Sequence, residues 1–117
     1  ITITSAEIDD GGNVAVVDPG DTVDLAIDYE ISDCGCPGCI DQIEIGLVPG
    51  DGVAYCAYSD VPGCEGESGS DTGTLTAPSD PGEYWIRFGL GQDYGCHEEW
   101  WHETPPEART LGALCVR

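Results

Sequence analysis

The feature that most constrains the fold is the segment from Val23 to Ile31, in which apolar and mostly polar residues alternate. A period of two places alternate side chains on opposite faces of an extended chain, so this segment is predicted to be a strand with one buried face. Residues 18–21 read Asp-Pro-Gly-Asp, in which proline presets a turn and glycine relaxes it. The residues predicted to share the buried face are Val23, Leu25, Ile27, Tyr29 and Ile31.

A second alternating run contains Tyr84, Ile86 and Phe88, with Trp85 and Arg87 between them. We expect the apolar face of this run to pack against that of the first, because both must leave water. The 17 glycines and 8 prolines favour short strands and tight turns over helices. Further strands are predicted at residues 1–8, 14–17, 43–47, 53–58, 72–76 and 111–116, of which 14–17 is either the partner of the first strand or a short edge strand. Residues 64–71, rich in Glu, Gly and Ser, are expected to be mobile.

This pattern predicts an all-β protein. We expect one immunoglobulin-like domain over residues 1–117, an antiparallel β-sandwich of seven or eight short strands. A chain of 117 residues fits one domain and can bury a core. No apolar run approaches the roughly 18 residues that cross a bilayer, so no membrane insertion is expected.

Seven cysteines in 117 residues indicate a disulfide-braced domain, as is typical of small secreted proteins. We therefore expect an extracellular or cell-surface location, with Ile1 as a processed end. An odd number leaves one thiol over, either free or bonded to another subunit. We favour a Cys56–Cys64 pair, because Pro62 and Gly63 between them can turn the chain back. The cysteines assigned to disulfides are Cys34, Cys36, Cys39, Cys56, Cys64, Cys96 and Cys115.

Two other chemistries fit the cysteine cluster at residues 34–39. Three thiolates spaced C-x-C-x-x-C could hold zinc with Cys96, His97 or His102 as the fourth ligand. Cys36 and Cys39 could also form a redox-active pair. Structural disulfides are favoured, because zinc sites usually show two such knuckles and a redox pair needs a helix N-terminus. No metal or other cofactor is therefore expected here.

The charge is strongly acidic, with 23 carboxylates against three arginines and a net charge of -20. Electrostatic repulsion excludes nucleic acid and anionic membrane surfaces as partners. The acidic residues are scattered, which favours a surface adapted to salt over a set of cation sites. Calcium is the weaker alternative because ordinary turn chemistry explains its best candidates, which are Asp9, Asp10, Asn13, Asp18 and Asp21.

Aromatic residues are the candidate binding groups. Trp85 is predicted on the outward side of its strand, and the adjacent Trp100 and Trp101 cannot both face inward on a strand. Exposed aromatics mark interfaces generally, and indoles can stack on sugar rings. Arg87 beside Trp85 is a candidate anchor for a carboxylate of a neighbouring subunit or strand. A large aromatic cap on the core is the simplest explanation of the tryptophan pair.

Two phrases carry a family resemblance: "VVDPGDTVDLAIDYEI" at residues 16–31 and "GTLTAPSDPGEYWIRFGL" at residues 73–90. They resemble the strand entries of bacterial extracellular immunoglobulin-like modules of the CARDB type. In those modules a "pGd" turn opens the second strand and an "aP…pGeY" turn opens the penultimate one. The resemblance implies a non-catalytic, surface-exposed module.

The sequence thus predicts a secreted structural or adhesion module that is not an enzyme. Its expected partners are other protein subunits, including copies of itself, or surface glycans. One alternative is a carbohydrate-binding module that uses Trp85, Trp100 and Trp101. The other is a metal-binding module for zinc or calcium.

Overall fold

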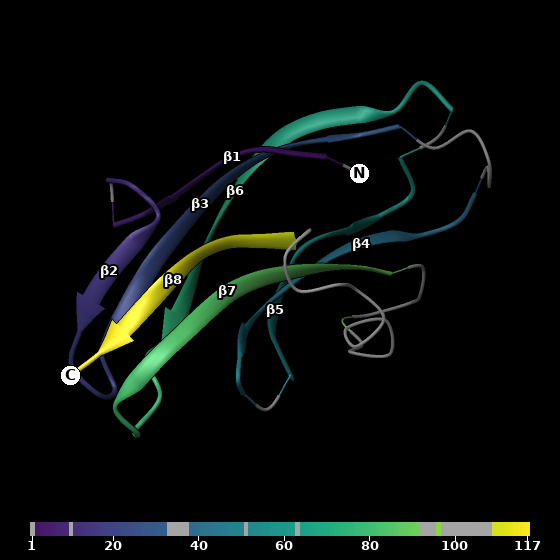
Figure 1. Cartoon of the computed structure of the whole chain (residues 1–117). Coiled ribbons are helices and arrows are strands. Elements are labelled where there is room, and N and C mark those ends of the chain that lie inside the picture. The colour runs from purple at the N-terminus through teal and green to yellow at the C-terminus, as the bar shows by residue number, and fades with distance from the viewer. Residues whose placement is uncertain are drawn as a thin grey trace.

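The structure is a computed structural model that describes residues 2–9, 11–32, 38–50, 52–62, 64–91, 96 and 109–117. Within these ranges the chain forms eight strands and no α-helix (Figure 1). A helix able to cross a membrane is accordingly not found in this part of the chain. The predicted all-β class and strand number are confirmed. The strands are β1 (Thr2–Ile8), β2 (Val14–Val17), β3 (Thr22–Ile31), β4 (Asp41–Val48), β5 (Gly52–Asp60), β6 (Glu67–Thr76), β7 (Gly82–Gly91) and β8 (Thr110–Val116).

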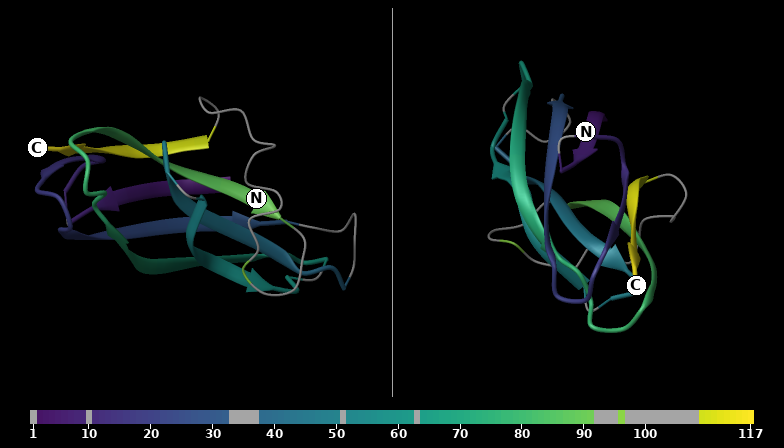
Figure 2. Two further views of the ribbon diagram at one scale, coloured as in Figure 1. Left: turned by 90° about the horizontal axis from the view of Figure 1, so that it is seen from below. Right: turned by 90° about the vertical axis from the view of Figure 1, so that its left-hand side faces the viewer.

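The strands form two sheets, which Figure 2 shows as two layers. One sheet has the order β1-β3-β6, and the other has the order β2-β8-β7-β4-β5. The pairings are antiparallel except for β2 and β8, which run parallel. The expected all-antiparallel arrangement is therefore wrong at this pair. The chain leaves the first sheet between Ile8 and Val14 and enters the second beside β8 in the same direction.

Strand β3 has the predicted alternation of buried and exposed residues. Val23 and Leu25 are each 1% exposed and Ile27 is 2% exposed, whereas Asp24 and Asp28 between them face solvent. All ten residues of β3 pair with β6, and β1 pairs along its other side. Central position and period-two patterning together give β3 a face that is buried except at Tyr29, which is partly buried.

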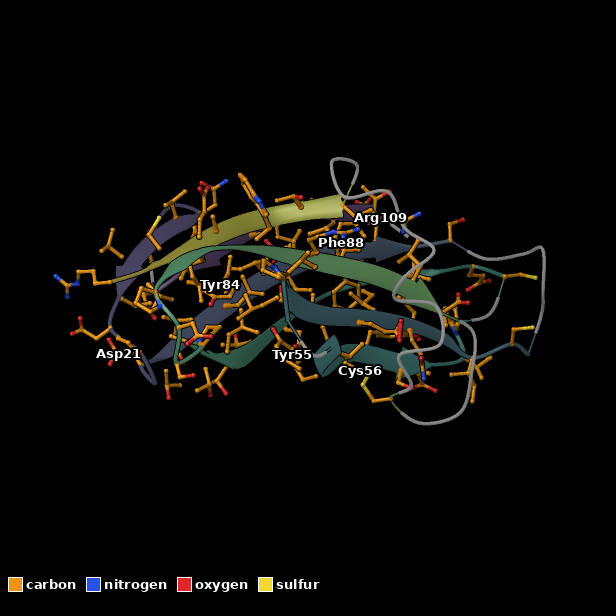
Figure 3. The ribbon with its side chains drawn as sticks, turned by 60° about the horizontal axis from the view of Figure 1, so that its bottom comes forward. Asp21, Tyr55, Cys56, Tyr84, Phe88 and Arg109 are labelled. Carbon is orange, nitrogen blue, oxygen red and sulfur yellow. A yellow bond between two sulfur atoms is a disulfide. The ribbon has the colours of Figure 1, made fainter. Side chains whose placement is uncertain are left out.

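The opposite sheet supplies the other half of the core. Ile86 of β7 and Ile45 of β4 are fully buried, and Tyr84 is 9% exposed. Phe88 packs against the same cluster, and the Arg109 guanidinium carbon lies 5.6 Å from the centre of its ring (Figure 3). The prediction that the two alternating runs bury their apolar faces together is confirmed, since one cluster contains residues of both.

The turn that leads into β7 is held by a tyrosine. The hydroxyl of Tyr84 donates a hydrogen bond to the backbone carbonyl of Asp80 at 2.8 Å. The ring of Tyr84 belongs to the buried cluster, so the side chain joins the turn to the core. This contact fixes where β7 starts relative to the end of β6.

Residues 64–71 were predicted to form a mobile loop. This prediction is wrong from Glu67 onward, because β6 begins there. Ser and Gly have low β-propensity, but the ten-residue ladder with β3 outweighs it. Two glycines on the inner face of β6 also make room for tyrosines. An added Cβ would lie 2.4 Å from the Tyr55 ring at Gly73 and 2.8 Å from the Tyr29 hydroxyl at Gly69.

Substituting Gly73→Ala is expected to lower the free energy of unfolding by about 1–3 kcal/mol, because the Tyr55 ring must move. A lower free energy of unfolding would be informative, because alanine normally stabilises a strand relative to glycine. Gly11→Ala is the matched control, since nothing lies within 4 Å of its added Cβ. Urea unfolding of both variants measures the difference. Equal stability of Gly73→Ala and wild type would contradict the packing argument.

Candidate functional site

A strip of apolar side chains crosses the outer face of the five-stranded sheet, the face that points away from the core. Val14 is 59% exposed, Val16 is 62% exposed and Trp85 is 47% exposed. Among the described residues, these are three of the four large hydrophobic side chains that face solvent, the fourth being Val61. The predicted outward position of Trp85 therefore agrees with the structure.

Strand register brings these residues together from three elements. Ala113 of β8 pairs with Trp85 of β7 on one side and with Val14 of β2 on the other. Two residues farther along both strands, Cys115 of β8 pairs with Val16 of β2. Directly paired residues project on the same face of a sheet and lie within contact distance. We call this set the outer patch: Val14, Val16, Trp85, Ala113 and Cys115.

The outer patch is uncharged in a chain of net charge -20. Its nearest acidic neighbour in the register is Glu83, which pairs with Cys115 and is exposed. Cys115 carries a partly buried thiol that is not in a disulfide. An uncharged apolar strip with an acidic neighbour suits docking against another apolar surface, since contact there expels water without burying a carboxylate.

Farther along the same face the side chains are polar but buried. Gln42 and Glu44 are fully buried, and Arg87 is only 7% exposed. Because Arg87 is buried within the chain, it is not positioned to anchor a carboxylate of a neighbouring subunit. The expected alternative, a carboxylate of a neighbouring strand, stays a prediction. Sequence alternation alone could not reveal the burial of Arg87, since it identifies the outward side of a strand but not what covers that side.

The Cys56–Cys96 disulfide ties the connection between β7 and β8 to strand β5, with the two Cα atoms 5.7 Å apart (Figure 3). The favoured Cys56–Cys64 pair is wrong. Pro62 was expected to turn the chain back beside Cys56, but the segment after β5 carries the chain into the other sheet. Cys39 is also disulfide-bonded, so the expected internal bracing is present.

Several predicted site residues lie outside the described residues. These include both other cysteines of the 34–39 cluster, the tryptophan pair, and the histidines considered for zinc. In the described part of the chain, His, Cys, Asp and Glu side chains do not gather into a group of three that could hold a metal ion. The residues outside are Asp10, Cys34, Cys36, His97, Trp100, Trp101 and His102.

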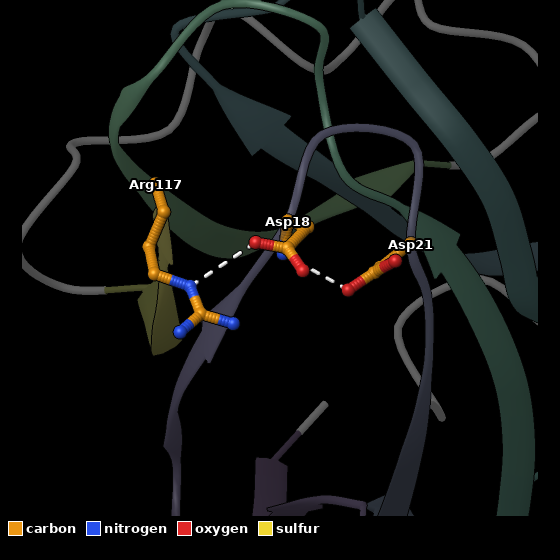
Figure 4. A network of polar contacts seen from close by, with 3 residues as sticks. All are labelled: Asp18, Asp21 and Arg117. Atoms are coloured by element: carbon orange, nitrogen blue, oxygen red, sulfur yellow. Dashed lines mark hydrogen bonds and ion pairs between the residues drawn. The ribbon is translucent and has the colours of Figure 1, made fainter.

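The described calcium candidates act as turn residues. The Asp24 backbone N–H donates to the Asp9 carboxylate at 2.9 Å, and the Asp18 N–H donates to the Asp21 carboxylate at the same distance. Arg117 donates to the Asp18 carboxylate at 3.1 Å, which fastens the chain end to this turn (Figure 4). Gly20 has φ 81°, the left-handed conformation that a Pro-Gly turn requires at this position.

A groove of about 590 Å³ lies between the β4–β5 turn and the β6–β7 turn. Pro49, Leu75, Pro78 and Tyr84 contribute to its walls, with Asp80 as the one carboxylate among the lining residues. Tyr84 also forms part of the core. Its composition suits an apolar or aromatic group better than a charged one.

Tyrosines close the opposite end of the core, between β3, β5 and β6. The Tyr58 hydroxyl donates to the Glu67 carboxylate at 2.7 Å, and its ring meets that of Tyr29 edge-on at 5.5 Å. Burial, with a smaller contribution from the charge of Asp71, raises the pKa of Tyr55 to about 12. These contacts hold β5 against the other sheet.

The outer face of the three-stranded sheet carries a row of hydroxyls around one carboxylate. Ser70 donates to Asp28 at 2.5 Å and Ser5 donates to it at 2.8 Å. These two hydrogen bonds, with that of Ser70 the stronger influence, hold the pKa of Asp28 below its usual value. The row is solvated, and it links β1, β3 and β6 side by side.

Substituting Ser70→Ala is expected to raise the pKa of Asp28 toward its ordinary value, because the charged carboxylate loses its main donor. A lowered folded-state pKa gives stability that is present above the unfolded-state pKa and is lost as the pH falls through the folded-state value. The Ser70→Ala variant should therefore lose less stability on acidification than wild type. Carboxyl NMR titration measures the pKa, with Thr74→Ala as the control. An unchanged Asp28 pKa would contradict the assignment of Ser70 as the main cause.

Comparison with protein-family models, with curated proteins and with solved structures finds no match for this chain.

The sequence predicts the outward position of Trp85, and it leaves residues 14–17 as either the partner of the first strand or a short edge strand. The structure makes them an edge strand. Residues 14–17 read Val-Ala-Val-Val, so neither face of this strand carries a polar side chain. A strand of that composition must either be buried on both faces or expose apolar groups. Only the position of β2 at the edge of its sheet decides between the two.

Proposed function

We propose that this protein is a secreted, non-catalytic structural or adhesion module that acts by protein–protein contact, as a subunit of a surface assembly. The observation that carries the proposal is the outer patch, in which half-exposed Trp85 and exposed Val14 flank the buried Ala113 of β8, with exposed Val16 next to them, in a chain of net charge -20. Contiguous exposed apolar groups on a polar protein mark interaction sites. Tryptophan is also among the residues enriched at interface hot spots.

We further propose that the fold is an immunoglobulin-like β-sandwich. The strand order supports it, because β8-β7-β4-β5 corresponds to the G-F-C-C′ order of a variable-type domain and β1-β3-β6 corresponds to A-B-E. The hydrogen bond from Tyr84 to Asp80 supports it as well, since immunoglobulin domains carry such a tyrosine at the start of strand F. Ile86 stands two residues later, where antibody domains have a cysteine.

An extracellular location is part of the proposal. The disulfides support it, because such bonds persist in oxidising compartments and are rare where thiols are kept reduced. The acidic charge supports it further, since a surface with 23 carboxylates stays soluble and separated from neighbours unless salt screens it. Under this proposal, an uncharged patch is the place where a partner can approach at least electrostatic cost.

Carbohydrate binding is the second candidate function. The exposed indole of Trp85 favours it, because an open aromatic face can stack on a sugar ring. It would require Trp100 and Trp101 to extend the platform. A metal-binding role has no comparable support among the described residues.

The proposal is tested with an epitope-tagged chain produced in its native cells. We expect the tag to be accessible to antibody on intact cells, and the solubilised chain to elute well above the 12.3 kDa of one copy. Trp85→Ser should reduce the larger species, whereas Val61→Ser, the matched exposed control, should not. A chain found inside cells, or one that elutes as a single copy in every variant, would contradict the proposal. Loss of binding to a glycan array in Trp85→Ser, with no protein complex, would favour the second candidate.

A further inference from the structure

Strand β2 is an open edge. It stands at one end of the five-stranded sheet with β8 as its neighbour, and in Figure 1 it lies at the left margin of the molecule. The backbone carbonyl of Asn13 accepts a hydrogen bond from Ala113 of β8 at 2.8 Å, and that of Val17 accepts one from Arg117, directly after β8, at 3.0 Å. Backbone groups alternate sides along a strand, so Val14 and Val16 direct their N–H and C=O groups away from β8. These are the groups that another strand could pair with.

The side chains of β2 do not protect this edge. Natural edge strands are usually blunted by charges, proline or a bulge. In β2, Val17 is buried and Ala15 packs against the core, while Val14 and Val16 expose their side chains. The strand thus combines outward backbone groups that no other described strand pairs with and exposed apolar side chains on the same two residues.

We propose that β2 pairs antiparallel with β2 of a second copy, which joins two five-stranded sheets across a two-fold axis. This inference rests on the proposed function as an assembly subunit. The spacing is self-complementary: Val14 of one copy faces Val16 of the other, and Ala15 faces itself on the axis. In such a ladder the valine pairs are hydrogen-bonded, each exchanging two bonds, and the Ala15 pair is the closely spaced, non-bonded type. A small side chain suits that close position.

Charge favours a copy that approaches by this edge over other faces. Each copy carries a net charge of -20, so like surfaces repel, but β2 has no charged residue. The nearest acidic residue beyond its end, Asp18, is paired with Arg117 at 3.1 Å. Pairing also continues the outer patch across the axis, since Val14 and Val16 of both copies lie on one face.

The contact is small. The apolar area that one four-residue strand offers is well below the roughly 1,600 Å² of a standard interface. We therefore expect a weak dimer that forms at high protein concentration and strengthens with salt, because salt screens the charge of both copies.

Sedimentation velocity of the purified chain over a range of protein and sodium chloride concentrations tests the inference, together with amide hydrogen exchange by NMR. We expect a dimer in high salt in which the amides of Val14 and Val16 become protected. Val16→Pro removes one outward N–H per copy and leaves the β8 ladder intact, so it should weaken the dimer roughly 10- to 100-fold. If this variant has a lower melting temperature, Val16→Thr decides instead, because it keeps a β-branched strand residue and should weaken the dimer several-fold.

Two results with the purified chain would overturn the inference, and a third comes from the cell-surface complex. One is a chain that stays monomeric at all concentrations and salts. The other is a dimer whose Val14 and Val16 amides exchange as in the monomer, because that dimer uses another surface. If Trp85→Ser abolishes the cell-surface complex while Val16→Pro leaves it unchanged, the proposed function stands and the β2 pairing fails. If no cell-surface complex exists but the purified chain dimerises through β2, the proposed function fails and the pairing stands.

Discussion

Replacing both Cys56 and Cys96 with alanine is expected to lower the free energy of unfolding by about 4 kcal/mol. The disulfide closes a loop with a sequence separation of 40, and the chain-entropy model gives a stabilisation of about that size for such a loop. The native protein also loses the bond that holds residue 96 beside β5. Guanidinium unfolding of the purified variant under oxidising conditions measures the change.

Cys115→Ala is the control for this experiment. Its thiol is not in a disulfide and is only partly buried, so the free energy of unfolding should stay within about 0.5 kcal/mol of wild type. A double variant that is as stable as Cys115→Ala would contradict a stabilising role for the Cys56–Cys96 bond. Adding reductant to wild type should cause a loss at least as large, because it also breaks the disulfide of Cys39.

Ile86→Ala is expected to lower the free energy of unfolding by about 2–5 kcal/mol. Ile86 is fully buried in β7 and faces the core that both sheets share. Truncation removes apolar contacts and leaves a cavity that the surrounding strands fill only in part. Thermal and urea unfolding should both report the change, because small single domains usually unfold in one step.

Val61→Ala is the matched control for Ile86→Ala, because Val61 is 40% exposed and lies outside the buried cluster. We expect a change of at most about 0.5 kcal/mol. If Ile86→Ala cost no more than Val61→Ala, the two sheets would not share the core described above. In that case the position of β7, and with it that of Trp85, would need revision.

The predicted interactions at the surface differ from these core contacts in their response to salt. Core contacts change little with ionic strength, whereas repulsion among 23 carboxylates falls as the Debye length shortens to about 8–10 Å. Pairing through β2 should therefore strengthen as the salt concentration rises. The same repulsion acts within one copy, so salt should raise the melting temperature of the monomer as well as strengthen the pairing.

The sequence by itself determined the class of the protein and the faces of its main strands. Alternation from Val23 to Ile31 predicted which side of β3 is buried, and the run through Ile86 did the same for β7. These predictions hold because side-chain direction in a strand depends only on local period, which neighbouring residues carry. The predicted turn at residues 18–21 holds for the same reason, since proline and glycine act through their own backbone angles.

Only the tertiary structure decided what lies next to each strand. Cys56 bonds Cys96 because sheet pairing places β5 within reach of the β7–β8 connection, and spacing along the chain does not record that. Strand β6 begins at Glu67 because β3 supplies a ladder for residues of low strand propensity. Arg87 is buried although its position on the outward side of β7 predicts exposure, and Val16 is exposed although its strand is wholly apolar, because burial depends on which segments cover a face. The outer patch exists for the same reason: pairing between distant strands assembles it from residues that no local pattern connects.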